Sequence, residues 1–274
     1  MSILLGLKGS TDPVQLADRL RYHPDVYEFF LNEQDFTATG LQRLRAAIAR
    51  VQQVTPRIVL HQPMRYQGQF TELITREQAY PDLYRFIWRS TYHLLNIAAT
   101  MGVQVLIHGA YARQTAQQIA TYPDFATAQA TLFQRLDTLK RIGGKRVMFE
   151  NSMHPLFSYS VPAFNQQLLQ HHYRLAFDTS HCFIGANGDQ QTLQQALMQL
   201  APQVVHYHLV DSFGKTHDSL PLGHGKINWS SVLPRLNPRA SYIYEINLVD
   251  QNRCREQIAS YRYLQSVALQ MGIH

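Results

Sequence analysis

Short apolar runs alternate along the chain with longer segments whose apolar residues recur every three to four positions. The short runs have the length of strands, whereas the longer period is typical of amphipathic helices. The pattern predicts eight strands, at residues 3–8, 26–31, 57–61, 103–108, 145–150, 173–178, 203–209 and 241–246. It predicts helices at residues 38–53, 77–101, 125–142, 161–171, 189–200 and 252–270. Strands that alternate with helices favour a parallel sheet, and a closed (β/α)8 barrel (TIM barrel) of the α/β class needs eight strands.

The length of the chain favours one domain. Its 274 residues are close to the roughly 250 residues of a typical barrel, and the sequence contains no internal repeat, low-complexity tract or linker. We therefore expect a single barrel domain over residues 1–274. Residues 210–240 depart from the pattern as a long connection with little helical periodicity. Connections of this length in compact domains are usually functional.

One register explains both faces of six strands. Side chains alternate between the two faces of a strand, and each of these strands ends at or near a polar residue: His61, His108, Glu150, Asp178, His208 or Glu245. Two positions earlier, a mostly apolar layer should fill the barrel with Val59, Leu106, Met148, Ala176, His206 and Ile243. Four positions earlier, a more polar layer near the barrel floor should contain Arg57, Gln104, Arg146, Arg174, Val204 and Ser241. The opposite face should meet the helices through Ile58, Leu60, Val105, Ile107, Val147, Phe149, Leu175, Phe177, Tyr242 and Tyr244.

The six strand-end residues are all potential metal ligands. The C-terminal ends of parallel barrel strands meet at one mouth, where barrel enzymes carry their active sites. Neighbouring strands lie about 4.8 Å apart, so one ion can be held by residues from four successive strands, Glu150, Asp178, His208 and Glu245. His61 and His108 could hold a second ion together with Glu150. Carboxylates and imidazoles together suit manganese, zinc, cobalt or iron, and magnesium also stays open.

Other polar residues near these strand ends are weaker candidates. His181 follows Asp178 by three residues and could face the same pocket, and Asn151 could orient a site carboxylate or bind substrate. His217 and His224 lie in the long connection, where each is as readily a surface residue as a site residue. A lone histidine is more often a hydrogen-bonded core residue, and we expect this of His206, one layer deeper than His208. Glu28 could point into the pocket or be structural, and Cys182 is expected to be an ordinary buried thiol.

Composition narrows the function classes only slightly. The formal charge of +6 and the pI of about 9.3 permit a nucleic-acid or phosphorylated partner, but the basic residues are dispersed, which favours a solvated basic surface. Two cysteines give no disulfide framework. No apolar run is long enough to span a membrane and the start reads as a strand, so a cytoplasmic location is expected. The sequence has no GxGxxG, P-loop, GxSxG or HExxH motif.

Several strand-end motifs together resemble the xylose isomerase-like barrel superfamily, which includes sugar isomerases, sugar epimerases and the endonuclease IV type of DNA-repair enzyme. The motif DTSHCF, followed by HLVDS and LGHG, is the most specific part. The resemblance covers most of the chain from residue 57 onward and rests on VLHQP at 59–63, VLIHGA at 105–110, MFENS at 148–152, AFDTSHCFIGANGD at 176–189, HYHLVDS at 206–212, LGHGKINW at 222–229 and YEI at 244–246.

The two branches of this superfamily imply different roles for the same residues. Resemblance to the isomerases implies that Glu150, Asp178, His208 and Glu245 bind one divalent ion. Glu150 and Glu245 would also move a proton between adjacent carbons of a ketose through a metal-stabilised enediolate. Substrate-binding roles would fall to His61, His108, Asn151 and His181. Resemblance to endonuclease IV instead implies zinc ligands at His61, His108, Glu150, Asp178, His181, His208 and Glu245.

The third zinc of endonuclease IV distinguishes the branches. That family completes it with an Asp-x-His pair, and the corresponding positions here are His217 and Ser219. His217 could still coordinate an ion, but a serine is a poor zinc ligand, and the ending GKINW is more like the isomerase branch. The leading hypothesis is therefore a divalent-metal-dependent isomerase or epimerase with a carbohydrate-like substrate. A zinc-dependent phosphodiesterase acting on abasic or damaged DNA is the alternative, and a non-catalytic metal-binding barrel is the second alternative.

Overall fold

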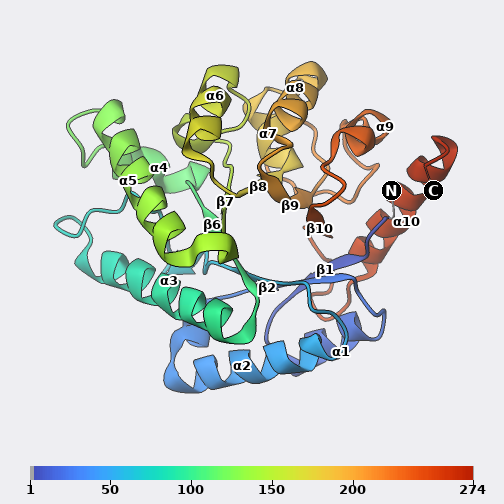
Figure 1. The fold of residues 1–274 in the computed structure, drawn as a ribbon, viewed down its shortest axis with the longest axis horizontal. Helices are drawn as coiled ribbons and strands as arrows, with labels where there is room; N and C mark the ends of the chain where they lie inside the picture. The colour runs from blue at the N-terminus through green and yellow to red at the C-terminus, as the bar shows by residue number, and fades with distance from the viewer. Residues whose placement is uncertain (1–2, 274) are drawn as a thin grey trace.

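Eight parallel strands form a nearly closed barrel surrounded by helices (Figure 1). The structure is a computed structural model, and it describes residues 3–273. The barrel strands follow one another around the sheet in chain order. They are β1 (Gly6–Gly9), β2 (Val26–Phe30), β3 (Ile58–His61), β6 (Gln104–His108), β7 (Val147–Glu150), β8 (Leu175–Asp178), β9 (Val204–Leu209) and β10 (Ser241–Tyr244). The α/β barrel fold predicted from the sequence is confirmed.

Helices occupy the outside of this barrel and the connections at its mouth. They are α1 (Pro13–Leu20), α2 (Ala38–Gln52), α3 (Pro81–Met101), α4 (Ala112–Ile119), α5 (Phe125–Gly143), α6 (Pro162–His171), α7 (Thr179–Gly185), α8 (Gln190–Leu200), α9 (Trp229–Val232) and α10 (Arg255–Gln270). Short 3-10 turns are η1 (Glu33–Phe36), η2 (Gly144–Arg146), η3 (Pro155–Phe157) and η4 (Leu233–Arg235), and a small hairpin is formed by β4 (Arg65–Tyr66) and β5 (Gln69–Phe70). Among residues 3–273, no helix combines the length and apolar character needed to cross a bilayer.

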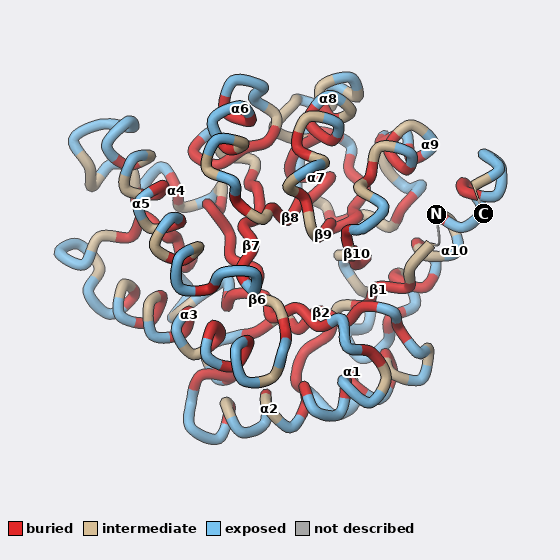
Figure 2. The backbone as a smooth tube through the Cα atoms, in the orientation of Figure 1, coloured by how far each residue is buried: buried red, intermediate tan, exposed pale blue. Residues whose placement is uncertain are grey.

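The two ends of the sheet meet where β1 lies against β10. A Cβ atom added to Gly6 would lie 1.8 Å from the carbonyl oxygen of Tyr242, so only glycine permits this approach. The backbone N–H of Leu4 donates a hydrogen bond to the Tyr242 hydroxyl at 2.6 Å. The first and last strands are thereby held together, and the buried strands trace a ring at the centre of the molecule (Figure 2).

The predicted alternation of faces is present in the strands except at the start of β9. There a register shift against β8 places Val204 in the core between strands and helices and Val205 against the inner cluster, so Val204 does not join the predicted floor layer. Val59, Leu106, Met148 and Ala176 form a separate buried cluster inside the barrel. All ten residues expected on the outward face belong to the large core between the strands and the helices. A shift by one residue would exchange the two faces of a strand. The observed register therefore directs the polar side chains at the strand ends toward the mouth of the barrel.

Several predicted boundaries are wrong. The helix predicted from residue 77 begins at Pro81, where the fixed φ of proline suits the first helical position. The strand predicted from residue 145 begins at Val147, because residues Gly144–Arg146 form a 3-10 turn, and Arg146 does not join the floor layer. Glu245 lies one residue beyond the end of β10. Four helices within residues 3–273 were not predicted, because each is short: α1, α4, α7 and α9.

Candidate metal centre

The barrel mouth brings together four strand-end residues in one group. Glu150 ends β7, Asp178 ends β8, His208 lies near the end of β9 and Glu245 follows β10. One ligand atom from each lies within 4.8 Å of the others. The Nδ1 atom of His208 is 3.1 Å from Glu150 Oε1 and 2.5 Å from Glu245 Oε2. Three of the four residues are fully buried, and Glu245 is partly exposed.

The buried atoms of this group lack ordinary partners. Both carboxylate oxygens of Glu150, Oδ2 of Asp178 and Nδ1 of His208 are buried and make no well-oriented hydrogen bond, although nitrogens of His108 and His208 lie within ion-pair distance of Glu150. Buried polar atoms are nearly always paired, and an unpaired buried charge is expensive. Lone pairs from carboxylates and an imidazole that converge in this way fit a divalent cation. Glu150, Asp178, His208 and Glu245 are therefore the residues that would hold an ion.

A second group shares Glu150 with the first. His61 ends β3 and His108 ends β6, and their Nε2 atoms are 3.2 Å apart. The same two atoms lie 3.6 Å and 3.0 Å from Glu150 Oε2. His61, His108 and Glu150 thus form a separate group of potential ligands. Burial lowers the His61 pKa, which keeps that imidazole neutral, the form that binds metals.

Glu28 supports the centre from the layer below. Its Oε2 atom lies 3.0 Å from His208 Nε2 and 3.1 Å from His206 Nε2, and it is completely buried. The other ring nitrogen of His206 is 2.7 Å from the Ser241 hydroxyl. A carboxylate on the far nitrogen of a ligand histidine fixes the orientation of its ring. Glu28 and His206 therefore position His208 from behind.

Lys8 was not predicted as a site residue. Its Nζ atom contacts Glu245 and lies 3.6 Å from Glu28 Oε1. The sequence did contain a signal, because Lys8 ends its predicted strand at a position like that of the six potential ligands. Metal ligands are expected among imidazoles and carboxylates, whereas the ammonium group of a lysine is itself a cation and cannot bind a metal ion. It instead compensates the excess of carboxylates at the mouth.

Asn151 and His181 flank Asp178. The Asn151 side chain accepts the backbone N–H of Asp178 at 2.8 Å and donates to its carbonyl at 3.1 Å, so it positions this strand end. The backbone N–H of His181 donates to Asp178 Oδ1 at 2.6 Å, because Asp178 caps α7. The His181 ring lies 4.8 Å from that of His217. His224, by contrast, is an exposed residue.

Burial and neighbouring charges set opposite pKa shifts within the centre. Burial alone would raise the Glu150 pKa, but His108 and His208 outweigh it and hold that pKa well below its ordinary range. Burial would lower the His208 pKa, yet Glu150 and Glu245 raise it well above its ordinary value. Burial and the nearby Glu150 and Glu245 raise the Asp178 pKa to about 6. Burial lowers the His181 pKa to about 4.

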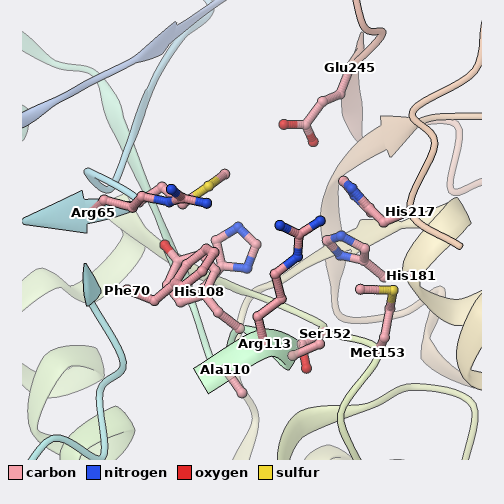
Figure 3. Close-up of a pocket in the computed structure, with 13 residues that line it drawn as sticks. Arg65, Phe70, His108, Ala110, Arg113, Ser152, Met153, His181, His217 and Glu245 are labelled. Carbon is pink, nitrogen blue, oxygen red and sulfur yellow. The ribbon is translucent and has the colours of Figure 1, made fainter. Parts of the chain in front are cut away.

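A pocket of about 230 Å³ opens over this centre. Figure 3 shows His108, His181, His217 and Glu245 directed toward its interior. The wall opposite His181 comes from the β4–β5 hairpin and from the start of α4. The pocket therefore gives a small molecule access to the potential metal ligands.

Solved structures share this fold at low sequence identity. A 3-keto-D-glucoside 4-epimerase from E. coli is 14% identical, with a TM-score of 0.65 over 97% of this chain and 100% of that one. A Thermus thermophilus protein soaked with zinc chloride is 18% identical, with a TM-score of 0.64 over 98% and 99%. A family 2 AP endonuclease from Brucella melitensis is 14% identical, with a TM-score of 0.62 over 95% and 98%. Such low identity establishes the fold alone.

The sequence also matches a known family. No curated protein matches the chain, whereas the xylose isomerase-like TIM barrel family matches residues 27–246. This range contains all six strand-end residues and the motifs on which the resemblance was based, so the predicted resemblance is confirmed. The chain belongs to the xylose isomerase-like TIM barrel family.

Proposed function

We propose that the protein is a divalent-metal-dependent isomerase or epimerase of a sugar or sugar-like compound. The observation that carries this proposal is the placement of two glutamates around one imidazole. Glu150 and Glu245 both lie against Nδ1 of His208 and come from different strand ends. Two carboxylates that converge on one point from separate strands can act on a substrate as base and acid.

The protein's own carboxylates account for the proton transfers. A bound divalent ion would supply Lewis-acid polarisation of the substrate carbonyl, which makes the neighbouring C–H more acidic. One glutamate then accepts the proton from that carbon. In an isomerisation a proton is returned to the adjacent carbon, and in an epimerisation the second glutamate returns one to the opposite face of the same carbon. Glu245 lines the pocket, whereas Glu150 is completely buried beneath it.

The size of the pocket supports a small substrate. Its volume is about 230 Å³, and a second hollow of about 330 Å³ shares Met64, His217 and Glu245 with it, so the mouth has the size of a small-molecule site, roughly 300–1,000 Å³. His181 and His217 face this space and offer polar contacts for hydroxyl groups. A polyol of sugar size fits this combination of volume and imidazole walls.

Exchange of a substrate proton with solvent deuterium tests the proposal directly. Manganese-loaded protein is incubated with a panel of ketoses in deuterium oxide, and C–H loss is followed by NMR. Glu150→Gln and Glu245→Gln keep the shape but remove the basic group, so exchange should fall by roughly 10²–10⁴-fold. Glu77→Gln, at an exposed position, is the matched control and should exchange at the wild-type rate. A Glu245→Gln variant with wild-type exchange would remove that residue from the mechanism.

A second candidate function is hydrolysis of a phosphodiester in abasic or damaged DNA. The specific observation in its favour is the group His61, His108 and Glu150, which shares a carboxylate with the first group. Two adjacent ions can activate water and hold a scissile phosphate. Anomalous scattering from metal-loaded crystals separates the candidates. One ion among Glu150, Asp178, His208 and Glu245 supports the isomerase, and two or three close ions support the hydrolase.

A further inference from the structure

We propose that the substrate carries an anionic group, a phosphate or a carboxylate, and that Arg65 and Arg113 bind it. This inference rests on the proposed isomerase function and adds the chemical class of its substrate. Both arginines line the pocket above the metal centre. Figure 3 shows their guanidinium groups directed into the pocket from two different elements.

Neither guanidinium has a carboxylate partner within residues 3–273. The ion pairs formed by arginines in this part of the chain belong to others, namely Arg19, Arg21, Arg43 and Arg85. Arg65 stacks on the Phe70 ring at 4.5 Å, which orients it without neutralising it. Both residues are exposed, which is ordinary for unpaired arginines, but their convergence on one pocket makes them an anion-binding pair in this proposal. The planar guanidinium matches phosphate and carboxylate oxygens in a bidentate fashion.

The elements that carry these arginines are joined to each other. Arg65 lies on the β4–β5 hairpin and Arg113 is the second residue of α4. The Gln114 side chain accepts the backbone N–H of Phe70 at 2.7 Å. The rings of Phe70 and Tyr111 are 5.3 Å apart, and Tyr111 stacks on His108 at 4.3 Å. Hairpin and helix therefore form one wall, attached to the metal centre through His108.

The chemistry of this wall favours negative charge. Arg113 lies in the first turn of α4, so its charge and the positive end of the helix dipole act in the same direction. The carboxylates of the metal centre lie below and are compensated by Lys8 and His208. A substrate that reaches from the centre to the wall would thus place its anionic end between the arginines.

A small anionic sugar suits this wall better than a nucleic acid does. Duplex binding requires a broad series of phosphate contacts, whereas the wall offers two guanidinium groups within a pocket of about 230 Å³. One phosphate or carboxylate occupies such a pair. The reacting carbons would then lie over Glu150 and Glu245, several bonds away from the anionic group.

Matched ketoses test the inference by calorimetric titration of the manganese-loaded protein. D-fructose, D-fructose 6-phosphate and D-fructuronate differ only at C6, which is a hydroxymethyl group, its phosphate ester or a carboxylate group. We expect one of the two anions to bind at least about tenfold more tightly than fructose. This preference should fall to roughly twofold or less in the Arg65→Gln, Arg113→Gln double variant. Arg141→Gln, on the exposed outside of α5, should keep it, and the stronger anion distinguishes phosphate from carboxylate.

Each remaining outcome overturns the inference. Equal binding of the three compounds, or no measurable binding of any, contradicts an anion-binding wall. A preference that survives in the double variant shows that the anion binds elsewhere, for example on the ion. Loss of abasic-duplex binding in the double variant without any effect on the ketoses would assign the arginines to DNA. Deuterium exchange tests the proposed function separately. Tight anion binding without exchange on any ketose would support the anion-binding wall and contradict the isomerase function.

Discussion

The ammonium group of Lys8, near the end of the first strand, contacts the carboxylate of Glu245, just beyond the last strand. The pair spans the point where the two ends of the sheet meet, and it also orients a glutamate to which we assign proton transfer. Burial would lower the Lys8 pKa, but Glu245 and Glu28 outweigh it and raise the pKa above its ordinary value. Lys8 therefore stays charged and links closure of the barrel to the chemistry at its mouth.

Replacing Lys8 with methionine should destabilise the metal-free protein by about 3 kcal/mol, because Glu28 and Glu245 lose their counter-charge in a largely buried setting. Urea unfolding measures the loss. In the Lys8→Met, Glu245→Gln double variant one of the two uncompensated charges is absent, so the double variant should be more stable than the Lys8→Met variant. Additive effects of the two substitutions would show that the pair does not couple.

Asp178→Asn should stabilise the metal-free protein at neutral pH. The pKa of about 6 lies above the ordinary 3.8, so stability from the protonated carboxyl is complete below about pH 4 and is lost as pH rises through 6. Asparagine keeps the acceptor for Ser180 and His181 at Oδ1, and it removes the ionisation. The variant should therefore match the wild type near pH 4 and exceed it at pH 7 in urea unfolding with chelator present.

Metal binding reverses this comparison. An ion binds the ionised carboxylate, so manganese should stabilise the wild type at pH 7 and should do so less as pH falls below 6. Asp178→Asn removes a charged ligand and should gain little stability from manganese at any pH. If added manganese stabilised both proteins equally, Asp178 would not be a ligand.

The sequence allowed prediction of the group of strand-end residues because each strand contributes one of them in the same register. Their convergence follows from parallel topology, and no long-range contact had to be guessed. The role of Glu28 was left open, since nothing local distinguishes a buried glutamate that pairs with His208 from a structural one. Arg65 and Arg113 were not predicted as pocket residues for another reason. They lie on a hairpin and a helix that are too short to show a periodic pattern of apolar residues. Their joint placement depends on a contact between Gln114 and Phe70.

Glu28→Gln should weaken metal binding by about 10–100-fold, the usual effect of losing a carboxylate that orients a ligand histidine. Glutamine preserves the volume but removes the charge that stabilises the ring of His208. Glu72→Gln is the control, because Glu72 is also buried and contacts none of the potential ligands. Burial raises its pKa to about 8, so it is already neutral at pH 7. Competition with a fluorescent chelator measures the affinity, and equal affinities in both variants would contradict the assigned role of Glu28.

Zinc- or manganese-loaded protein should not cleave an abasic-site duplex efficiently. None of the potential ligand groups found in residues 3–273 includes His181 or His217, although their rings are close. Ser219 offers no strong ligand, and the adjacent Asp218 carboxylate accepts a hydrogen bond from the Thr216 hydroxyl. A third ion therefore lacks the ligands that endonuclease IV would need at these positions.

Incubation with an end-labelled duplex, resolved on a denaturing gel, measures the cleavage. Weak DNA binding that disappears as salt rises would not contradict the prediction, because a chain of formal charge +6 binds phosphates nonspecifically. Efficient incision that is abolished by both His108→Ala and Glu150→Gln would contradict it, because those substitutions remove the second ligand group. The hydrolase would then become the better assignment, and Glu150, which both potential ligand groups share, would serve as a ligand instead of moving a proton.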